Sequence, residues 1–375
     1  MRIALVHDYL TRLGGAERVL FALSQIFPKA SIFTLIYNEK KVGKFFSKDK
    51  IHCSFLQKYP KFFRNHPKYL LPFLAPAVES IDLRNYDLII SSSSAFIKGI
   101  IVKPKSIHIC YCHSPVRFLW DWTHEYYQEN KFSYGIIAKF FIHYLRMWDK
   151  SASQRVDFFI ANSQTTANRI NKYYRKEAKV IYPPCDLINN SIKINHIGNK
   201  NFKISKNRDY FLIVSQLTPY KKLDIAIKAF NKLELPLLIV GEGPDRCRLE
   251  KIAQKNIKFA GFQPEESLVW FYQNCKALIF PGEDDFGITP VEAMNFGKPV
   301  LALRKGGATE SIIEGVTGEF FDDPIAEILA DGVRRLLENY SNFNPLFIKK
   351  RAERFSQENF KKEILDFVNK VCYNN

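Results

Sequence analysis

The stretch from residue 277 to residue 312 most constrains the fold, because it combines short apolar runs, glycine-containing loops and helix patterns. Residues 277–280 form an apolar run closed by a proline–glycine pair, which predicts a short buried strand. Three acidic residues, 283–285, would then lie just past the carboxyl end of that strand. Ligands bind at this edge of an open parallel sheet. The stretch therefore predicts an α/β fold with a ligand site beside the acidic loop.

A helix is predicted directly after this loop. Thr289 precedes Pro290, whose fixed φ suits a first helical position, and Glu292 follows Thr289 in the spacing of a capping box. Gly297 is expected to end the helix. By this pattern alone, Glu292 would only satisfy backbone donors at the helix start, without binding a ligand.

The order of apolar run, loop and helix pattern recurs in both halves of the chain. Strands are predicted for residues 3–6, 87–91, 97–102, 107–111, 158–161, 180–182, 210–214, 237–240 and 257–260. Alternating strands and helices predict parallel sheets, and a length of 375 residues predicts two domains. We place the domains at residues 1–184 and 208–350, with a polar linker at 185–207 and a C-terminal helix at 351–375.

The composition narrows the class of partner. The formal net charge of +17, from 55 Lys and Arg against 38 Asp and Glu, favours anionic partners. Dispersed cations without a nucleic-acid-binding motif argue against nucleic acid, which leaves lipid headgroups or a phosphorylated substrate. Seven cysteines without a C-x-x-C pair favour a reducing compartment. Because the apolar runs are too short for a signal peptide or a membrane span, we expect a cytoplasmic protein.

Two cofactor patterns in the sequence are incomplete. His108, Cys110 and Cys112 alternate along one predicted strand and His113 follows, but ligands along a single strand cannot close a zinc tetrahedron. A Gly-x-Gly follows residues 237–240, but Arg246 stands where a dinucleotide fingerprint has its third glycine. Neither a metal site nor an NAD site is predicted.

The acidic loop and the helix after it resemble the family 4 retaining glycosyltransferases. The family signature is a Glu, a Phe-Gly pair and a second Glu after seven intervening residues; here Asp284 stands for the first Glu, and Phe286, Gly287 and Glu292 follow. The resemblance implies a GT-B fold, with two Rossmann-like domains facing a central cleft. It also implies that Glu292 holds the ribose of a nucleotide-sugar, while Asp284 contacts the donor sugar.

The sequence S-Q-L-T-P-Y-K-K resembles the loop that binds the donor diphosphate in this family. Family members commonly carry Arg at the position of Gln216 and Lys at the position of Lys221, and only the lysine is retained here. Lys222, Arg304 or Lys305 would supply the missing cation. Alternatively, Lys221 and Lys222 are an ordinary solvated pair. No Asp-x-Asp motif occurs, so the resemblance implies a metal-independent reaction.

The sequence HSPVRFLWD, which begins at His113, resembles bacterial O-antigen mannosyltransferases. His113 matches the family histidine near the anomeric carbon of the donor, or else is a polar loop histidine. The resemblance implies catalytic roles for His113, Asp284 and Lys221. The implied donor-binding residues are Gly14, Gly15, Gln216, Lys221, Lys222, Asp285, Phe286, Gly287 and Glu292.

The whole resemblance implies a hexosyltransferase for cell-surface polysaccharide synthesis. It would move mannose from GDP-mannose to a lipid-linked or oligosaccharide acceptor, with retention of configuration and no cofactor. Because Gln216 and Asp284 depart from the family pattern, the alternative is a catalytically silent sugar-nucleotide-binding protein. Residues 55–73 interleave cations and aromatic side chains, which predicts either contact with an anionic membrane surface or an aromatic core under a basic loop.

Overall fold

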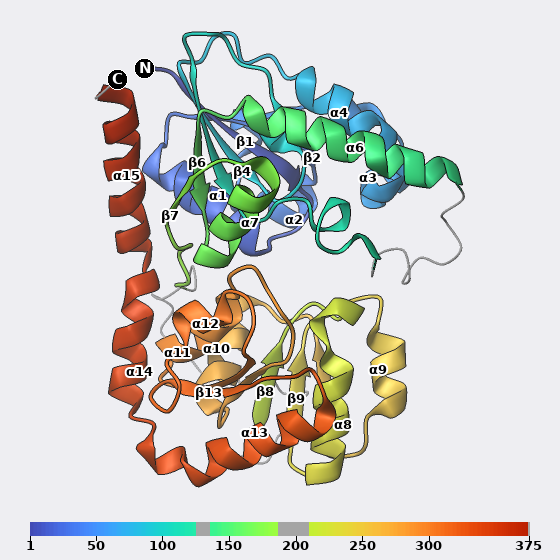
Figure 1. The fold of residues 1–375 in the computed structure, drawn as a ribbon, viewed down its shortest axis with the longest axis vertical. Coiled ribbons are helices and arrows are strands. Elements are labelled where there is room, and N and C mark those ends of the chain that lie inside the picture. Colours follow the sequence, from blue (N-terminus) through green and yellow to red (C-terminus); the bar gives the residue numbers. More distant parts are fainter. Residues whose placement is uncertain (125–135, 187–209, 374–375) are drawn as a thin grey trace. The chain divides into compact units, whose positions relative to one another are not determined.

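The computed structural model describes residues 1–124, 136–186 and 210–373. The chain divides into two compact units, Met1–Pro184 with Phe360–Asn375 and Cys185–Asn359 (Figure 1). Each unit contains one parallel sheet with helices on its faces, which confirms the α/β prediction. Most of the predicted linker, from residue 187 onward, lies outside the described residues.

The sheet of the first unit has the strand order β3-β2-β1-β4-β5-β6-β7, with all neighbouring strands parallel. The strands are β1 (Ile3–Leu10), β2 (Ser31–Tyr37), β3 (Ile51–Cys53), β4 (Leu88–Ser93), β5 (Ile107–Cys112), β6 (Phe158–Ala161) and β7 (Ala178–Val180). The chain order reverses between β1 and β4. The carboxyl ends of these two strands therefore form a topological switch point, where open α/β sheets bind ligands.

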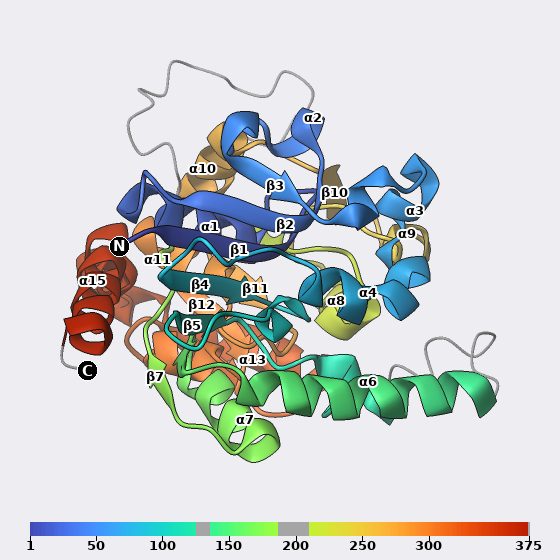
Figure 2. The ribbon, with the colours of Figure 1, turned by 90° about the horizontal axis from the view of Figure 1, so that it is seen from above.

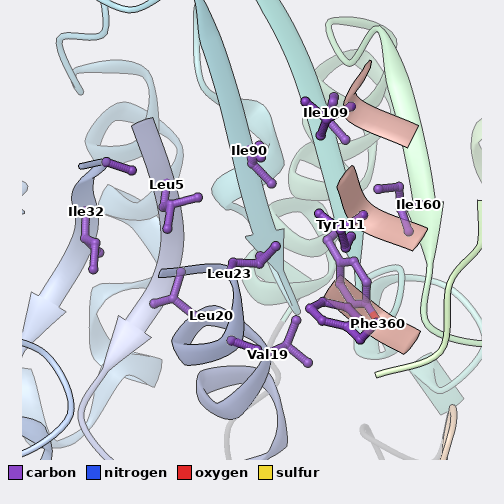
Figure 3. Close-up of a cluster of buried hydrophobic side chains, with 14 of the residues drawn as sticks. Leu5, Val19, Leu20, Leu23, Ile32, Ile90, Ile109, Tyr111, Ile160 and Phe360 are labelled. Atoms are coloured by element: carbon purple, nitrogen blue, oxygen red, sulfur yellow. The ribbon is translucent and has the colours of Figure 1, made fainter. Parts of the chain in front are cut away.

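Helices cover both faces of this sheet (Figure 2). They are α1 (Gly15–Ile26), α2 (Glu39–Val42), α3 (Lys61–Asn65), α4 (Leu71–Glu79), α6 (Ile136–Gln154), α7 (Gln164–Tyr174) and α15 (Gln357–Tyr373), whose residues from Phe360 onward belong to this unit. Because strand side chains alternate, Leu5 packs with α1 and α15, whereas Ala4 and Val6 pack with α4 and α6. Figure 3 shows the first of these two cores, with Phe360 of α15 beside Tyr111 of β5.

The sheet of the second unit has the order β10-β9-β8-β11-β12-β13, again all parallel. The strands are β8 (Phe211–Val214), β9 (Leu237–Val240), β10 (Ile257–Gly261), β11 (Leu278–Phe280), β12 (Val300–Leu303) and β13 (Gly318–Phe321). The helices are α8 (Leu223–Leu233), α9 (Arg246–Ile252), α10 (Glu265–Asn274), α11 (Ile288–Asn295), α12 (Ala308–Ser311), α13 (Ala326–Glu338) and α14 (Pro345–Ala352). The switch point of this sheet lies between β8 and β11.

The strand predicted for residues 97–102 is wrong. Asp8 lies within β1, and its buried carboxylate accepts hydrogen bonds of 2.7–2.9 Å from the backbone N–H groups of residues 94–97. These bonds turn the chain after β4 into a 3₁₀ turn at Ile97–Gly99. Residues 97–100 are therefore buried as a turn, because the N–H of Ile97 and those of the three residues before it pair with a side chain instead of a neighbouring strand.

Among the described residues, no helix has both the length and the apolar character required to cross a membrane.

Candidate functional site

Two oppositely charged side chains meet at the switch point of the second sheet. Lys221 ends the 3₁₀ turn Pro219–Lys221 after β8, and Asp284 follows β11. Lys221 Nζ lies 2.5 Å from both carboxylate oxygens of Asp284, in a partly buried setting. Burial opposes the charge on Lys221, but attraction to Asp284, Tyr220 and Asp285 and the hydrogen bond to Asp284 together outweigh it and raise the pKa of Lys221 above its ordinary value. The structure thus joins two of the three predicted catalytic residues in one ion pair.

Three glycines allow the loops at this switch point to approach closely. A Cβ on Gly282 would lie 2.9 Å from the backbone of Lys221. A Cβ on Gly306 would lie 2.2 Å from the backbone oxygen of Asp284, and one on Gly307 would lie 2.3 Å from Cα of Phe286. These distances exclude any larger residue at the three positions, so the glycine loop after β12 packs directly onto the acidic loop after β11.

Glu292 does not form the predicted capping box. The helix α11 begins at Ile288 with Gly287 as its N-cap, so Thr289 already lies inside the first turn. Glu292 is buried, and its carboxylate accepts a 2.7 Å hydrogen bond from the hydroxyl of Tyr272. A buried carboxylate held by a tyrosine fits a polar ligand site better than a helix cap.

Gly297 ends α11 as predicted, with φ of +71° and the two backbone hydrogen bonds of a Schellman motif.

The other predicted donor-binding residues of the second unit surround this switch point. Gln216, after β8, and Lys222, the N-cap of α8, are exposed, and Asp285 is half-buried. Phe286 is buried, with its ring 5.5 Å from that of Phe355, so we expect its backbone instead of its ring to face a ligand. Gly287 adopts φ of +84° in front of α11.

Arg304 does not replace the missing cation at Gln216. Its guanidinium binds Glu314 and Asp322, with Nε 2.7 Å from the Asp322 carboxylate. These hydrogen bonds raise the pKa of Arg304 above its ordinary value. Lys222 and Lys305, both exposed, remain as candidates.

His113 lies at the carboxyl edge of the first sheet, immediately after β5. Its Nε2 is 2.8 Å from the hydroxyl of Ser92 on β4, and the same hydroxyl is 3.2 Å from Nδ1 of His7 on β1. Burial, followed by the nearby His7, lowers the pKa of His113 to about 3. A neutral His113 can donate a hydrogen bond to a sugar oxygen or accept one from a hydroxyl.

The glycine loop before α1 is closed by Glu17. The backbone N–H of Gly14 donates a 2.9 Å hydrogen bond to Glu17 Oε2. That N–H is therefore occupied in this structure, whereas Gly15 is exposed at the first position of α1. The donor-binding roles of Gly14 and Gly15 stay predictions. His7, Ser92 and Glu17 were not singled out from the sequence. The strand predicted for residues 3–6 is longer in the structure, and His7 lies within it on β1.

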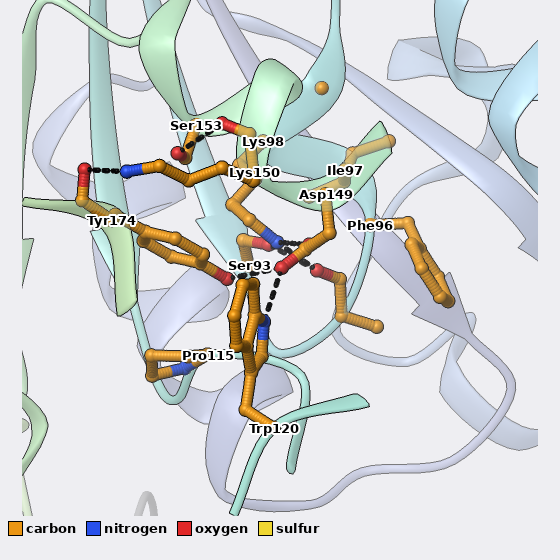
Figure 4. Close-up of polar contacts among 12 residues, drawn as sticks. Ser93, Phe96, Ile97, Lys98, Pro115, Trp120, Asp149, Lys150, Ser153 and Tyr174 are labelled. Carbon is orange, nitrogen blue, oxygen red and sulfur yellow. Dashed lines mark hydrogen bonds and ion pairs between the residues drawn. The ribbon is translucent and has the colours of Figure 1, made fainter. Parts of the chain in front are cut away.

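A buried polar network holds the loop that carries His113 (Figure 4). The side chains of Lys98 and Asp149 are fully buried, and Lys98 Nζ lies 2.5 Å from Asp149 Oδ1. The Asp149 carboxylate also accepts 2.8 Å hydrogen bonds from Trp120 Nε1 and from the Tyr174 hydroxyl. Because Trp120 lies at the end of the loop, the network anchors it to α6 and α7.

No group of three or more potential metal-ligating side chains occurs in the described parts of the chain. His108, which is part of the incomplete zinc pattern in the sequence, contacts a serine: its Nε2 lies 2.8 Å from the Ser91 hydroxyl oxygen.

Each of the two units matches the model of a known protein family. Residues 13–188 match the model of Glycosyltransferase Family 4, and residues 198–362 match the model of Glycosyl transferases group 1. The chain belongs to the family 4 glycosyltransferases. The two matches account for nearly the whole glycosyltransferase chain.

Relatives of this glycosyltransferase include two mannosyltransferases. The O-antigen chain mannosyltransferase C of Escherichia coli is 26% identical over 50% of this chain and 50% of its own length. The alpha-1,3/1,6-mannosyltransferase ALG2 of Dictyostelium discoideum is 23% identical over 99% of this chain and 98% of its own length. An uncharacterised glycosyltransferase of Methanocaldococcus jannaschii is 28% identical over 52% of this chain and 53% of its own length. The chain thus spans about half the length of the bacterial and archaeal relatives.

Solved structures show the same fold. HepE of Anabaena, crystallised with UDP, matches with a TM-score of 0.72 at 18% identity, over 99% of this chain and all of that one. Sucrose-phosphate synthase of Thermosynechococcus elongatus matches with a TM-score of 0.70 at 16% identity, over the full length of both chains. The fold is therefore GT-B, as predicted.

Proposed function

We propose that this chain transfers mannose, with retention of configuration, from GDP-mannose to a lipid-linked saccharide. The carrying observation is the Lys221–Asp284 pair, which lies where β8 and β11 form the switch point of the second sheet. Ligands bind at such points in open α/β sheets. A lysine that is charged and only partly exposed suits a diphosphate leaving group.

In this proposal, the reaction uses residues of the chain in place of a metal ion. Lys221 neutralises the negative charge that develops on the diphosphate as the glycosidic bond breaks. Asp284 holds Lys221 in place before the donor binds and faces the sugar afterwards. Glu292, held by Tyr272, accepts hydrogen bonds from the ribose hydroxyls. His113 donates a hydrogen bond to the transferred sugar.

The choice of mannose draws on the names of the two mannosyltransferase relatives. A thermal-shift panel of GDP-mannose, GDP, UDP-glucose and UDP tests the donor, because a ligand that binds only the folded state raises its melting temperature. We expect the largest increase with GDP-mannose. Stabilisation by UDP-glucose without stabilisation by GDP-mannose would reject the proposed donor.

A surface on the first unit supports the lipid-linked acceptor. We call Phe55–Phe73 the aromatic–basic segment. Most of its aromatic side chains are exposed, whereas Tyr59 packs against the core. Phe62 is 58% exposed, Tyr69 is 50% exposed, and their rings stack with centroids 5.8 Å apart. The chain has no acidic residue from position 50 to position 78. Exposed aromatic rings among cations are typical of a surface that contacts the interface of an anionic bilayer.

The second candidate is a silent sugar-nucleotide-binding protein. The observation that favours it is the same ion pair, since Lys221 is engaged by Asp284 and Gln216 replaces the second cation. Nucleoside diphosphate release from GDP-mannose with a saccharide acceptor separates the two functions. Donor binding without any release would favour the silent protein.

A further inference from the structure

Two histidines share one serine hydroxyl at the carboxyl edge of the first sheet. His7 on β1 and His113 after β5 both face Ser92 of β4, with Nδ1 of His7 3.2 Å and Nε2 of His113 2.8 Å from Ser92 Oγ. Nδ1 of His7 also lies 2.9 Å from the Ser92 carbonyl oxygen. The three residues come from the strands around the switch point of this sheet.

The hydrogen-bond partners determine where the ring protons lie. A carbonyl oxygen only accepts, so Nδ1 of His7 must carry the proton that points to Ser92. The single proton of the Ser92 hydroxyl then goes to Nε2 of His113, which accepts it. The ring proton of neutral His113 therefore lies on Nδ1, a nitrogen without a hydrogen-bond partner in the described part of the chain.

A carboxylate faces the His7 ring on the side away from Ser92. Nε2 of His7 lies 3.8 Å from Oε1 of Glu17, while Glu17 Oε2 accepts the Gly14 N–H. Burial opposes the charge on Glu17, but the hydrogen bond and attraction from His7, with a smaller contribution from Arg12, lower the pKa of Glu17. For His113, burial is the largest influence and lowers the pKa; the nearby His7 also lowers it, whereas Glu17 raises it. The charged groups around the two rings are thus Glu17 and Arg12.

We propose that His7 and Glu17 are positioning residues, which orient His113 through Ser92 so that its Nδ1–H donates a hydrogen bond to an oxygen of the bound sugar. The proposal rests on the proposed glycosyltransferase function. Glu17 also ties the glycine loop at Gly14 to this pair, so the loop and the histidine are held by one carboxylate.

The test begins with the free protein and needs no substrate. In ¹⁵N-histidine-labelled protein, long-range ¹H–¹⁵N correlation spectra report the tautomer and titration of His113, whose signal is assigned by its loss in His113→Asn. We expect the Nδ1–H tautomer at pH 7 and no titration of His113 above pH 5. The Nε2–H tautomer, or a His113 that titrates near pH 6.5, would overturn the proposal.

The Glu17→Gln variant separates the charge from the loop contact. A glutamine oxygen can still accept the Gly14 N–H, so the glycine loop is retained, but His7 loses its anionic partner. We expect the His113 ring signals to shift from their wild-type positions, and kcat to fall about tenfold with an unchanged KM for the donor. The control is Glu39→Gln, which removes the same charge from an exposed pair with Lys48 in the same unit.

The spectra of His113 and the transfer activity of the variants together distinguish failure of this inference from failure of the proposed function. Transfer activity that is equal in Glu17→Gln and Glu39→Gln, with unchanged His113 spectra, would refute the positioning role but leave the glycosyltransferase intact. Spectra as expected in a chain without transfer activity would support the positioning role and refute the proposed function.

Discussion

At the scale of single residues, buried polar side chains in this protein are held by specific partners. Asp8 binds four backbone N–H groups, Glu292 binds Tyr272, and Asp149 binds Lys98, Trp120 and Tyr174. Such partners offset the cost of removing a polar group from water. They also fix the positions of the loops at the sheet edges, where the candidate site residues lie.

Glu292→Gln should weaken donor binding much more than it weakens the fold. The amide oxygen can still accept the hydrogen bond of the Tyr272 hydroxyl, whereas hydrogen bonds from ribose hydroxyls to a carboxylate lose the charge assistance. A loss of about 2 kcal/mol in binding, or roughly thirtyfold in Kd, is expected by calorimetry. The melting temperature without ligand serves as the control. Unchanged donor affinity would mean that Glu292 has only a structural role.

The stability of the protein should decrease on acidification because His108 is buried in its neutral form. Burial, followed by the charge of Arg155, lowers the pKa of His108 to about 3 from an ordinary value of 6.5. Between these two pH values the unfolded chain binds the extra proton, so stability falls as pH falls. At pH 5 the contribution is about 2 kcal/mol relative to pH 7. Urea unfolding of wild type and His108→Leu checks this, and equal pH slopes would contradict it.

At the scale of elements, local motifs were predicted better than strands that lack such a motif. The strand at residues 277–280 and the helix after it were found because an apolar run, a Pro-Gly pair and a glycine stop lie close together in sequence. The strands β2 and β3 were missed, and residues 97–102 were wrongly predicted as a strand. In the last case the decisive partner, Asp8, lies about 90 residues earlier in the chain.

The aromatic–basic segment should bind anionic vesicles. Each cation near an anionic leaflet contributes about 1 kcal/mol, so four cations and the exposed aromatic rings together favour weak, reversible attachment. Sedimentation with phosphatidylserine vesicles at low salt should carry down the wild type, and salt should release it. Replacing all four basic residues between positions 58 and 68 with alanine should abolish binding to the vesicles. The cations replaced are Lys58, Lys61, Arg64 and Lys68.

A matched control removes four cations elsewhere in the same unit, at Lys40, Lys41, Lys44 and Lys48. This control should still bind, because its aromatic–basic segment is intact. Equal losses in both variants would indicate that net charge alone drives binding. If the wild type does not bind the vesicles at low salt, the proposed membrane contact is wrong.

At the scale of the whole molecule, the sequence predicted the fold class and the second unit's site better than the first unit's site. Lys221 and Asp284 lie after neighbouring strands of one sheet, and a known family pattern covers both. In the first unit, His113 contacts Ser92 of β4 and through it His7 of β1, about 100 residues earlier in the chain. The connection from His113 to Glu17 therefore depends on strand order, and no local sequence pattern contains it.

The central claim is that Lys221 binds the diphosphate of a nucleotide-sugar without a metal ion. Calorimetric titration of GDP-mannose in the presence of EDTA tests it most directly, with wild type, Lys221→Ala and the control Lys228→Ala, an exposed lysine on α8. The account predicts binding by the wild type and the control, and an affinity about one hundredfold lower for Lys221→Ala. Equal affinity of Lys221→Ala and wild type, or wild-type binding that requires a divalent cation, would contradict it.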